Sequence, residues 1–521
     1  MQIIQINPRD NVAVALSPLD KGEKLVLKGR QITLNQPVPK GHKLALEAIP
    51  AGADVVKYGH RIGRATAALS PGDWVHTQNM QTALSEQQGY VYRPDFQPLP
   101  TEGSSTSALP GASSSNGLLS GPSAESEGPK GSFQGYLRRD GRAGVRNEIW
   151  ILPLVGCVND VCQELAAMAC GEPEGVCGVD GIYAFPHPYG CSQLGEDHEN
   201  TRKILAKLCR HPNAGGVLVV GLGCENNTME AFQTLLGDYD PERIRFMVCQ
   251  EVADELVTGQ ELLEELLGVA RRDRRETVPM RKLVVGMKCG GSDGLSGITA
   301  NPVVGAFSDR LIARGGSTIL TEVPEMFGAE EMLMNRCVSK EVFRDLEGMV
   351  QGFKDYFTRH GQTVYENPSP GNKDGGITTL EDKSLGCVQK GGSAPVVDVL
   401  DYGASVKKTG LSLLYGPGND LVSATALTAA GAQIILFTTG RGTPFGAPAV
   451  TLKLSSNSEL AERKPDWIDF DAGAVVRGAS IAEEGARLLA LVQEVADGKR
   501  QSKAEDRGYR GIAIFKNGVT L

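Results

Sequence analysis

Short apolar stretches, interrupted by Pro and Gly, alternate with polar positions through the first 85 residues. They cover residues 12–16, 25–27 and 31–34, and residues 49–59 repeat the pattern. Turn residues recur roughly every ten positions, a spacing that suits short antiparallel strands. The pattern predicts a small β domain over residues 1–85, with a barrel-like or clip-like fold.

After residue 133 the pattern changes to longer apolar runs, each of which ends in a Gly-rich turn. They cover residues 149–157, 216–224, 283–289 and 432–441, with helix-like stretches such as 202–210 and 251–270 between them. Continuous apolar runs are typical of buried parallel strands. We therefore predict an α/β fold with mainly parallel sheets. It forms two units, residues 133–275 and 276–521, divided near the charged stretch at 272–281.

A segment of different character separates the β domain from these units. Ser, Gly and Pro supply 19 of the 32 positions from 101 to 132. Such a segment buries too little apolar surface to offset the entropy of ordering it. We predict a flexible linker over residues 86–132.

Charge and composition exclude several classes of protein. The net charge is −9, whereas a nucleic acid or an anionic membrane would favour a basic surface. No run of about 18 apolar residues occurs, and the first residues do not resemble a signal peptide. The 11 Cys are scattered rather than dense, which indicates reduced thiols in a cytoplasmic protein. An anionic substrate would need a few local cations, because the overall field is negative.

Three cysteines stand out because each adjoins glycine: Cys191, Cys224 and Cys289. The last two follow predicted strands, where the ligands of such sheets collect. A thiolate at these places could bind iron or another transition metal. The alternative is that each is a small buried hydrophobe, the usual role of a free cysteine. Their spacing is too long for a local zinc motif.

Histidines are informative because there are only seven. His42 and His76 fall on turns of the predicted β domain, where they could converge on one cation. His187 and His198 flank Cys191, and His187 is a candidate acid or base. A structural or surface role remains open for each.

Three Gly-rich loops carry polar groups that could hold an anion. They contain Ser292 and Asp293, Asn372 and Lys373, and Arg441. Neither the P-loop pattern nor the dinucleotide-binding pattern opens a helix here, so a phosphate cradle is disfavoured. Tight turns are the simpler alternative. Glu322 and Glu325 could be metal ligands, acid/base groups or solvated carboxylates.

Longer motifs extend along almost the whole chain. They include Gly41-His-Lys, Val75-His, Tyr189-Gly-Cys-Ser-Gln, Gly221-Leu-Gly-Cys-Glu, Gly290-Gly-Ser-Asp-Gly, Glu366-Asn-Pro-Ser-Pro-Gly-Asn-Lys and Thr439-Gly-Arg-Gly-Thr-Pro. Together they resemble the altronate/galactarate dehydratase family, which has an N-terminal SAF-type domain. The stretches 377–386 and 467–473 look closer to the altronate branch than to galactarate dehydratases or sulfolactate sulfo-lyases. One departure is Gln78, where the family pattern has a second histidine.

This resemblance implies a hydro-lyase that converts D-altronate to 2-dehydro-3-deoxy-D-gluconate in galacturonate catabolism. Galactarate or sulfolactate chemistry is the alternative. The resemblance also implies a divalent metal activator, Fe²⁺ or Mn²⁺, with an iron–sulfur cluster as the less favoured option. A homodimer is expected. A rival from another class is a non-catalytic carbohydrate-binding protein whose N-terminal domain is the binding head.

The matched segments suggest roles for individual residues. The predicted catalytic residues are His187, Glu322 and Lys373. The predicted substrate-binding residues, together with Lys373, are Arg441, Asn372, Ser292 and Asp293. The predicted metal ligands are His42, His76, Cys191, Cys224 and Cys289.

Overall fold

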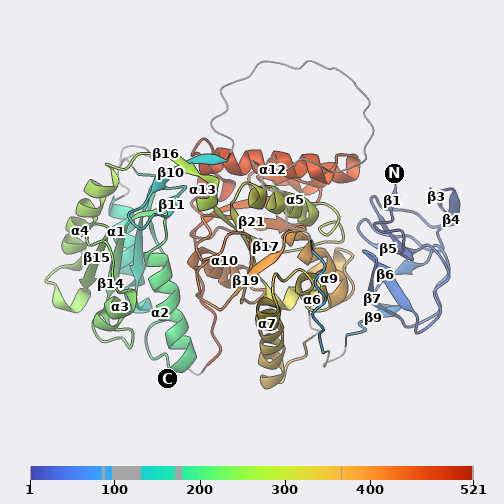
Figure 1. Cartoon of the computed structure of the whole chain (residues 1–521), viewed down its shortest axis with the longest axis horizontal. Helices are drawn as coiled ribbons and strands as arrows, with labels where there is room; N and C mark the ends of the chain where they lie inside the picture. Colours follow the sequence, from blue (N-terminus) through green and yellow to red (C-terminus); the bar gives the residue numbers. More distant parts are fainter. Residues whose placement is uncertain (1, 85–88, 97–130, 170–178, 365–366, 519–521) are drawn as a thin grey trace, which may run out of the picture.

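The computed structural model describes residues 2–84, 89–96, 131–169, 179–364 and 367–518. It contains three bodies in a row (Figure 1). The C-terminal α/β unit lies in the centre, the N-terminal β domain on one side, and the middle α/β unit on the other. The small β domain and the two α/β units predicted from the sequence are confirmed. Most of the predicted linker lies outside the described residues.

The N-terminal domain is built from short antiparallel strands. One sheet has the order β1-β2-β5-β8, a second has β6-β7-β9, and a hairpin pairs β3 with β4. The strand bounds are β1 Ile3–Ile4, β2 Val12–Ala15, β3 Lys24–Leu27, β4 Arg30–Thr33, β5 Lys43–Ala45, β6 Asp54–Lys57, β7 His60–Ala65, β8 Trp74–Val75 and β9 Met80–Gln81.

The middle unit has a four-stranded parallel sheet in the order β13-β12-β14-β15. Alternate residues of β12 face opposite sides: Ile149 and Ile151 pack under α1 and α4, while Trp150 and Leu152 pack under α2 and α3. This two-sided burial explains the continuous apolar runs. The bounds are β12 Glu148–Pro153, β13 Gly181–Ala184, β14 Ala214–Gly221, β15 Ile244–Val248, α1 Asn159–Ala169, α2 Gly195–Cys209, α3 Met229–Leu236 and α4 Glu255–Ala270.

The C-terminal unit has a seven-stranded parallel sheet in the order β19-β20-β18-β17-β21-β22-β23. Helices α5 and α12 pack together over it, as Figure 1 shows, and α10 contacts β17 and β21. Its strands are β17 Val284–Cys289, β18 Ser317–Leu320, β19 Val396–Leu400, β20 Leu411–Leu414, β21 Ile434–Thr439, β22 Val450–Ser455 and β23 Phe470–Asp471. Its helices are α5 Ala300–Ala313, α6 Glu330–Met334, α7 Lys340–Arg359, α8 Pro370–Asp374, α9 Leu380–Cys387, α10 Asp420–Ala429, α11 Ser458–Arg463, α12 Ile481–Ala496 and α13 Lys503–Asp506.

A small antiparallel sheet joins the two α/β units. Its order is β11-β10-β16, with β10 Ser132–Leu137, β11 Ala143–Gly144 and β16 Glu276–Pro279. The end of the chain adds a second connection, since Ile512 and Ile514 belong to the core of the middle unit. The backbone N–H groups of Asn517 and Gly518 donate to Asp197 at the start of α2.

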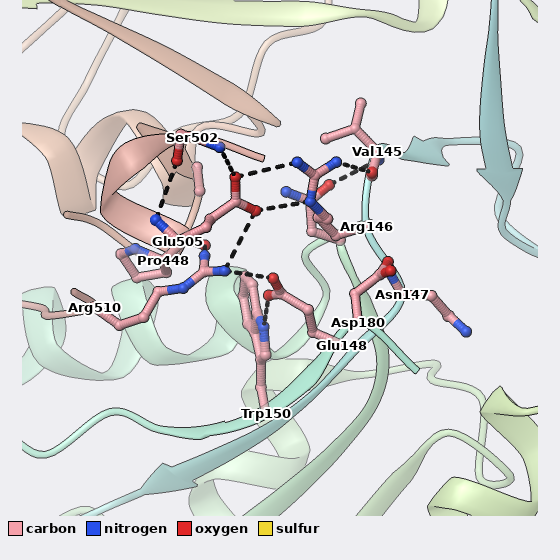
Figure 2. A network of polar contacts seen from close by, with 12 residues as sticks. Val145, Arg146, Asn147, Glu148, Trp150, Asp180, Pro448, Ser502, Glu505 and Arg510 are labelled. Carbon is pink, nitrogen blue, oxygen red and sulfur yellow. Dashed lines mark hydrogen bonds and ion pairs between the residues drawn. The ribbon is translucent and has the colours of Figure 1, made fainter. Parts of the chain in front are cut away.

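A buried ion network lies where this C-terminal tail meets the middle unit (Figure 2). Arg510 pairs with Glu148 at 2.7 Å, and Glu148 also accepts from Trp150 at 2.7 Å. Arg146 pairs with Glu505 at 2.7 Å. The two ion pairs therefore connect β12, and the residues just before it, to the last residues of the chain.

The described start of the predicted linker is not free of contacts. Tyr90 donates to Glu330, and Tyr92 donates to the carbonyl of Cys337 at 2.8 Å. The N–H of Asp95 donates to the carbonyl of Asn335 at 2.7 Å. Residues 89–96 thus lie along the C-terminal unit, because two tyrosines find buried partners there. The flexible linker predicted over residues 86–132 stays a prediction.

In the described ranges, no helix combines the length and apolar character needed to cross a membrane.

We expect stability to fall as the pH falls from 7.5 to 5.5, with His211 as one cause. His211 is buried between the carbonyl of Ala432 and the N–H of Asn213, and burial together with Arg142 lowers its pKa to about 3. As the pH falls, His211 therefore takes up a proton in the unfolded chain first, near pH 6.5. This uptake lowers the free energy of unfolding by about 1–2 kcal/mol at pH 5.5.

Urea titrations at both pH values would test this expectation. The His211→Gln variant should be less stable at pH 7.5 but should lose less on acidification than the parent. The matched control is His360→Gln, because His360 is exposed. An unchanged acid dependence in His211→Gln would contradict the assignment.

Candidate active site

Two thiols and a carboxylate meet at the carboxyl edge of the large sheet. Cys289 ends β17, Glu325 follows β18, and Cys387 ends α9. The Sγ of Cys289 lies 2.9 Å from Glu325 Oε2 and 3.5 Å from the Sγ of Cys387. Cys387 Sγ donates to the same Glu325 oxygen at 3.2 Å. All three residues are buried.

This triad can hold a metal ion. Its three ligand atoms lie within 4.8 Å of one another, which is the span that one ion requires. Thiolates and a carboxylate suit divalent transition metals. The prediction that Cys289 is a metal ligand therefore fits the structure, with partners other than those predicted for it.

Two buried lysines neutralise the triad. Lys390 Nζ lies 3.0 Å from Cys289 Sγ, and Lys383 Nζ lies 2.7 Å from Glu325 Oε1. A hydrogen bond from Cys387, aided by the lysines, lowers the pKa of Cys289 to about 6 against the effect of burial. Although burial opposes it, the same lysines hold the pKa of Glu325 at about 2. One thiol and the carboxylate are thus anionic near neutral pH, ready to bind a cation.

Glu322 has a different environment from Glu325. Its backbone is left-handed, at φ 74°, and its Oε2 accepts from the N–H of Cys289 at 2.8 Å. Burial, and next the charge of Glu325, raise its pKa well above the usual value. From this strained backbone position, the Glu322 carboxyl braces the end of β17. The catalytic role proposed for Glu322 stays a prediction, since this residue does not line the pocket described next.

A pocket of about 610 Å³ opens onto the triad. Its volume is in the usual range for small-molecule sites. Its polar lining is Cys289, Glu325, Asn367, Ser369, Asn372, Lys383, Asn419 and Asp420. Its aromatic lining is Phe353, Tyr356, Phe357 and Phe515.

Asp420 and Lys383 are the pocket's charged groups outside the triad. Asp420 begins α10, and its side chain is 41% exposed. Lys288, which is fully buried, holds Asp420 Oδ1 at 2.6 Å. A carboxylate fixed at one oxygen and a lysine are suitable partners for a hydroxy acid anion.

The N-terminal domain contacts α9 through two buried lysines. Lys43 Nζ lies 2.8 Å from Asp382 Oδ2, and Lys57 Nζ lies 3.1 Å from Asp382 Oδ1. Asp382 is next to Lys383, so this ion triplet supports the helix that carries the pocket lysine. Despite its burial, the two ammonium groups hold the pKa of Asp382 far below its usual value.

Glycines permit this close docking. A Cβ on Gly294 would lie 2.0 Å from the carbonyl oxygen of Gly41, and one on Gly376 would lie 2.3 Å from the same oxygen. Side chains at either position would push the N-terminal domain away from α8 and α9.

His42 and His76 converge, with ring centroids 4.9 Å apart. Burial is the main cause of a lowered pKa in both histidines, and the pKa of His76 falls to about 4. Both rings are therefore neutral at pH 7. His42 accepts from Trp74 at Nδ1 and contacts the carbonyl of Asp374 at Nε2. Both of its nitrogens therefore have protein partners. Metal ligation by His42 and His76 stays a prediction.

Several predicted substrate ligands have structural partners. Both oxygens of Asp293 accept hydrogen bonds, from Ser296, Ser456 and Asn457 among others. Asn372 lines the pocket, but its side-chain amide donates to the carbonyl of Ser292 at 2.8 Å. These residues shape the loops below the triad.

Lys373 and Arg441 lie away from the pocket lining. Arg441 is exposed and reaches the carbonyl of Gly371 at 3.3 Å. Lys373 is half-buried on α8, on the side that faces His76. Substrate binding by either stays a prediction.

His187, Cys191 and Cys224 belong to the middle unit. The Nε2 of His187 lies 2.7 Å from the carbonyl of Pro153, and its Nδ1 accepts from the N–H of Tyr189. Burial lowers its pKa to about 4. Both nitrogens are used to hold a loop, and the proposed proton transfer by His187 stays a prediction. Cys191 and Cys224 are exposed and do not join Cys289.

Four groups in or beside the triad and the pocket were missed from the sequence: Lys383, Cys387, Lys390 and Asp420. Lys383, Cys387 and Lys390 lie on or after a helix that is buried on all sides. A run of charges normally indicates a solvated face. The available signal was the unusual pairing of that charged run with small and apolar neighbours in residues 380–387.

A second cavity, of about 260 Å³, lies in the middle unit among several arginines. Arg138 and Arg243 pair there with Asp273, and Arg142 pairs with Asp140. The large pocket is the better candidate for the active site, because it opens onto Cys289 and Glu325 of the triad.

Comparison with known proteins matches the whole chain. Three sequence-family models apply: "Altronate/galactarate dehydratase SAF domain" at residues 1–83, "D-galactarate dehydratase/Altronate hydrolase, second domain" at 135–271, and "D-galactarate/Altronate dehydratase, C-terminal" at 280–520.

Relatives of known activity align over nearly their full length. Altronate dehydratase of Escherichia coli is 50% identical over 100% of both chains, and that of Bacillus subtilis is 48% identical over 99% of both. Galactarate dehydratase (L-threo-forming) of Escherichia coli is 33% identical over 98% of this chain and 96% of its own. The chain therefore belongs to the altronate/galactarate dehydratase family.

Proposed function

We propose that this chain is a hydro-lyase that dehydrates D-altronate to 2-dehydro-3-deoxy-D-gluconate, in the cytoplasm, within hexuronate catabolism. The observation that carries the substrate assignment is the higher whole-length identity to two altronate dehydratases than to a galactarate dehydratase. The pocket supports the reaction type, because it combines a cation, a carboxylate and a metal-binding triad.

The reaction removes a proton from C2 and a hydroxyl group from C3. Lys383 attracts the substrate carboxylate into a protein of net negative charge. Asp420, held by Lys288 through one oxygen, accepts the C2 proton on the other. The C3 hydroxyl group leaves as water with the proton that Asp420 has taken, and the resulting enol converts to the 2-oxo acid. The aromatic wall excludes bulk water around the departing group.

The triad fits the divalent metal that family membership implies, because its three donors are close together and two of them, Cys289 and Glu325, are anionic. When bound, the metal supplies Lewis-acid stabilisation of the charge that develops on the substrate carboxylate. Two cysteines favour Fe²⁺ over Mn²⁺, since thiolate is a soft ligand.

A 2-oxo acid assay with Fe²⁺ under reducing conditions tests the function. We expect D-altronate to give a kcat/KM at least about ten-fold above those for galactarate, D-gluconate and sulfolactate. A preference for galactarate would replace the substrate assignment. Binding of altronate without any 2-oxo acid would favour the carbohydrate-binding alternative.

Removal of one thiol from the triad should weaken metal binding. Cys387→Ser is expected to lower the affinity for Fe²⁺ by at least about ten-fold, because a serine hydroxyl stays protonated where a thiol can ionise. Metal content after anaerobic loading and desalting measures the effect. Cys337→Ser is the matched control, since Cys337 is also buried but lies outside the triad. Equal metal content in both variants would disprove ligation by Cys387.

A further inference from the structure

Three Gly–Cys pairs lie at one edge of the middle sheet. Cys157, Cys191 and Cys224 each directly follow a glycine. They come after β12, β13 and β14 respectively, which are neighbours in a parallel sheet. The three cysteines therefore lie beyond the same carboxyl edge, where the ligands of α/β sheets bind.

These three thiols are exposed, which is unusual for free cysteine. Five other cysteines that the structure describes are buried: Cys162, Cys209, Cys289, Cys337 and Cys387. Cys249, which follows β15 at the same edge, is half-buried. In the described part of the chain, full exposure of cysteine is confined to this edge.

The three loops touch one another. The N–H of Gly156 donates to the carbonyl of Tyr189 at 2.9 Å, which joins the Cys157 and Cys191 loops. Asn226 donates to the carbonyl of Gln193 at 3.3 Å, which joins the Cys224 and Cys191 loops. A Cβ on Gly190 would lie 2.1 Å from the carbonyl oxygen of Leu154, so the glycine allows this approach.

Hydrogen bonds around His187 fix the loop that carries Cys191. His187 bonds to Pro153 and Tyr189 through its ring, and its backbone exchanges two hydrogen bonds with the side chain of Asn159. The loop that carries Cys191 is thereby held against the end of β12. The thiols are pre-positioned by buried polar contacts rather than by one another.

The spacing of these sulfurs distinguishes between a single metal ion and an iron–sulfur cluster as the occupant of this edge. Two sulfurs on one ion stand at most about 4.6 Å apart, because metal–sulfur bonds are about 2.3 Å long. Among the described residues, the only three ligand atoms within 4.8 Å of one another are those of Cys289, Glu325 and Cys387. The three edge sulfurs therefore do not all lie within the span of one ion. Three neighbouring strand ends span about 10 Å, which suits a cluster whose cysteines bind different irons.

We propose that Cys157, Cys191 and Cys224 hold an iron–sulfur cluster at this edge, separate from the Cys289–Glu325–Cys387 triad. On assembly each thiol loses its proton and forms one bond to iron, with no change in the oxidation state of its sulfur. Three cysteines leave one iron of a four-iron cluster without a protein thiolate among the described residues. The proposal stands whether or not the chain dehydrates altronate.

Anaerobic reconstitution of the full chain with equal amounts of ferrous and ferric iron and with sodium sulfide tests the proposal, since this mixture already has the oxidation states of a four-iron cluster. We expect acid-labile sulfide and a visible sulfur-to-iron charge-transfer absorption. Each of Cys157→Ser, Cys191→Ser and Cys224→Ser should reduce the bound sulfide by more than half. The matched control, Cys249→Ser, changes a cysteine at the same edge and should keep the parent content.

Two outcomes would overturn the proposal. One is iron without labile sulfide after reconstitution. The other is a disulfide between two of the three cysteines in anaerobically prepared protein, detected by mass spectrometry. Cys387→Ser separates this result from the triad, because it should remove iron but leave sulfide unchanged. None of these measurements depends on turnover of altronate.

Discussion

Replacement of Asp420 by Asn is expected to lower kcat with D-altronate by about 10²–10⁴-fold, the usual contribution of a general base. The amide keeps the shape of the carboxylate but cannot take the C2 proton. Lys288 retains its contact with Glu322 at 3.1 Å, so the buried lysine keeps a partner and the fold should persist. Steady-state kinetics with metal content measured in parallel would show the effect.

The control for Asp420→Asn is Asp398→Asn. Asp398 also pairs with a lysine, Lys408 at 2.8 Å, but it does not line the pocket. That variant should keep parent kinetics. If Asp420→Asn turned over at the parent rate with normal metal content, Asp420 would be excluded as the base.

The largest loss of stability is expected for Arg510→Met. This change leaves the buried carboxylate of Glu148 without its cation, and breaking a buried ion pair from one side costs about 3–5 kcal/mol. Burial already raises the pKa of Glu148 despite Arg510, so the lone carboxyl should take up a proton. The folded form then binds more protons than the unfolded one, and the deficit should grow as the pH rises.

Urea titrations at several pH values would measure this deficit. Arg507→Met is the matched control, because Arg507 forms an exposed pair with Asp466 that is worth under about 1 kcal/mol. Adding Glu148→Gln to Arg510→Met should recover part of the loss, since the unpaired charge is then gone. Equal losses of stability in the two arginine variants would show that the ion network in Figure 2 stabilises the fold no more than an exposed ion pair does.

Local patterns were sufficient for most of the fold. The runs at residues 149–157 and 283–289 were apolar on both faces and became β12 and β17, the inner strands of two parallel sheets. The prediction did not specify which strands share a sheet. Cys224 and Cys289 follow strands of similar appearance, yet they lie in different sheets and cannot share one ion.

The candidate site was less predictable, because it depends on contacts between distant segments. Lys43 is buried only because the N-terminal domain docks on α9, more than three hundred positions away in the chain. Nothing near Lys43 in the sequence signals Asp382. Cys289 was found because it follows a predicted strand and adjoins glycine, whereas Cys387 also adjoins glycine but ends a short buried helix.

The last residues of the chain complete the core of the middle unit through Ile512 and Ile514. On the ribosome, β12 to β15 emerge long before these two side chains are made. The middle unit therefore keeps an apolar face uncovered until Ile512 and Ile514 emerge, and until then it is the part most in need of a chaperone. A truncation that removes only the segment with Ile512 and Ile514 should therefore destabilise the middle unit, although its strands are encoded hundreds of codons upstream.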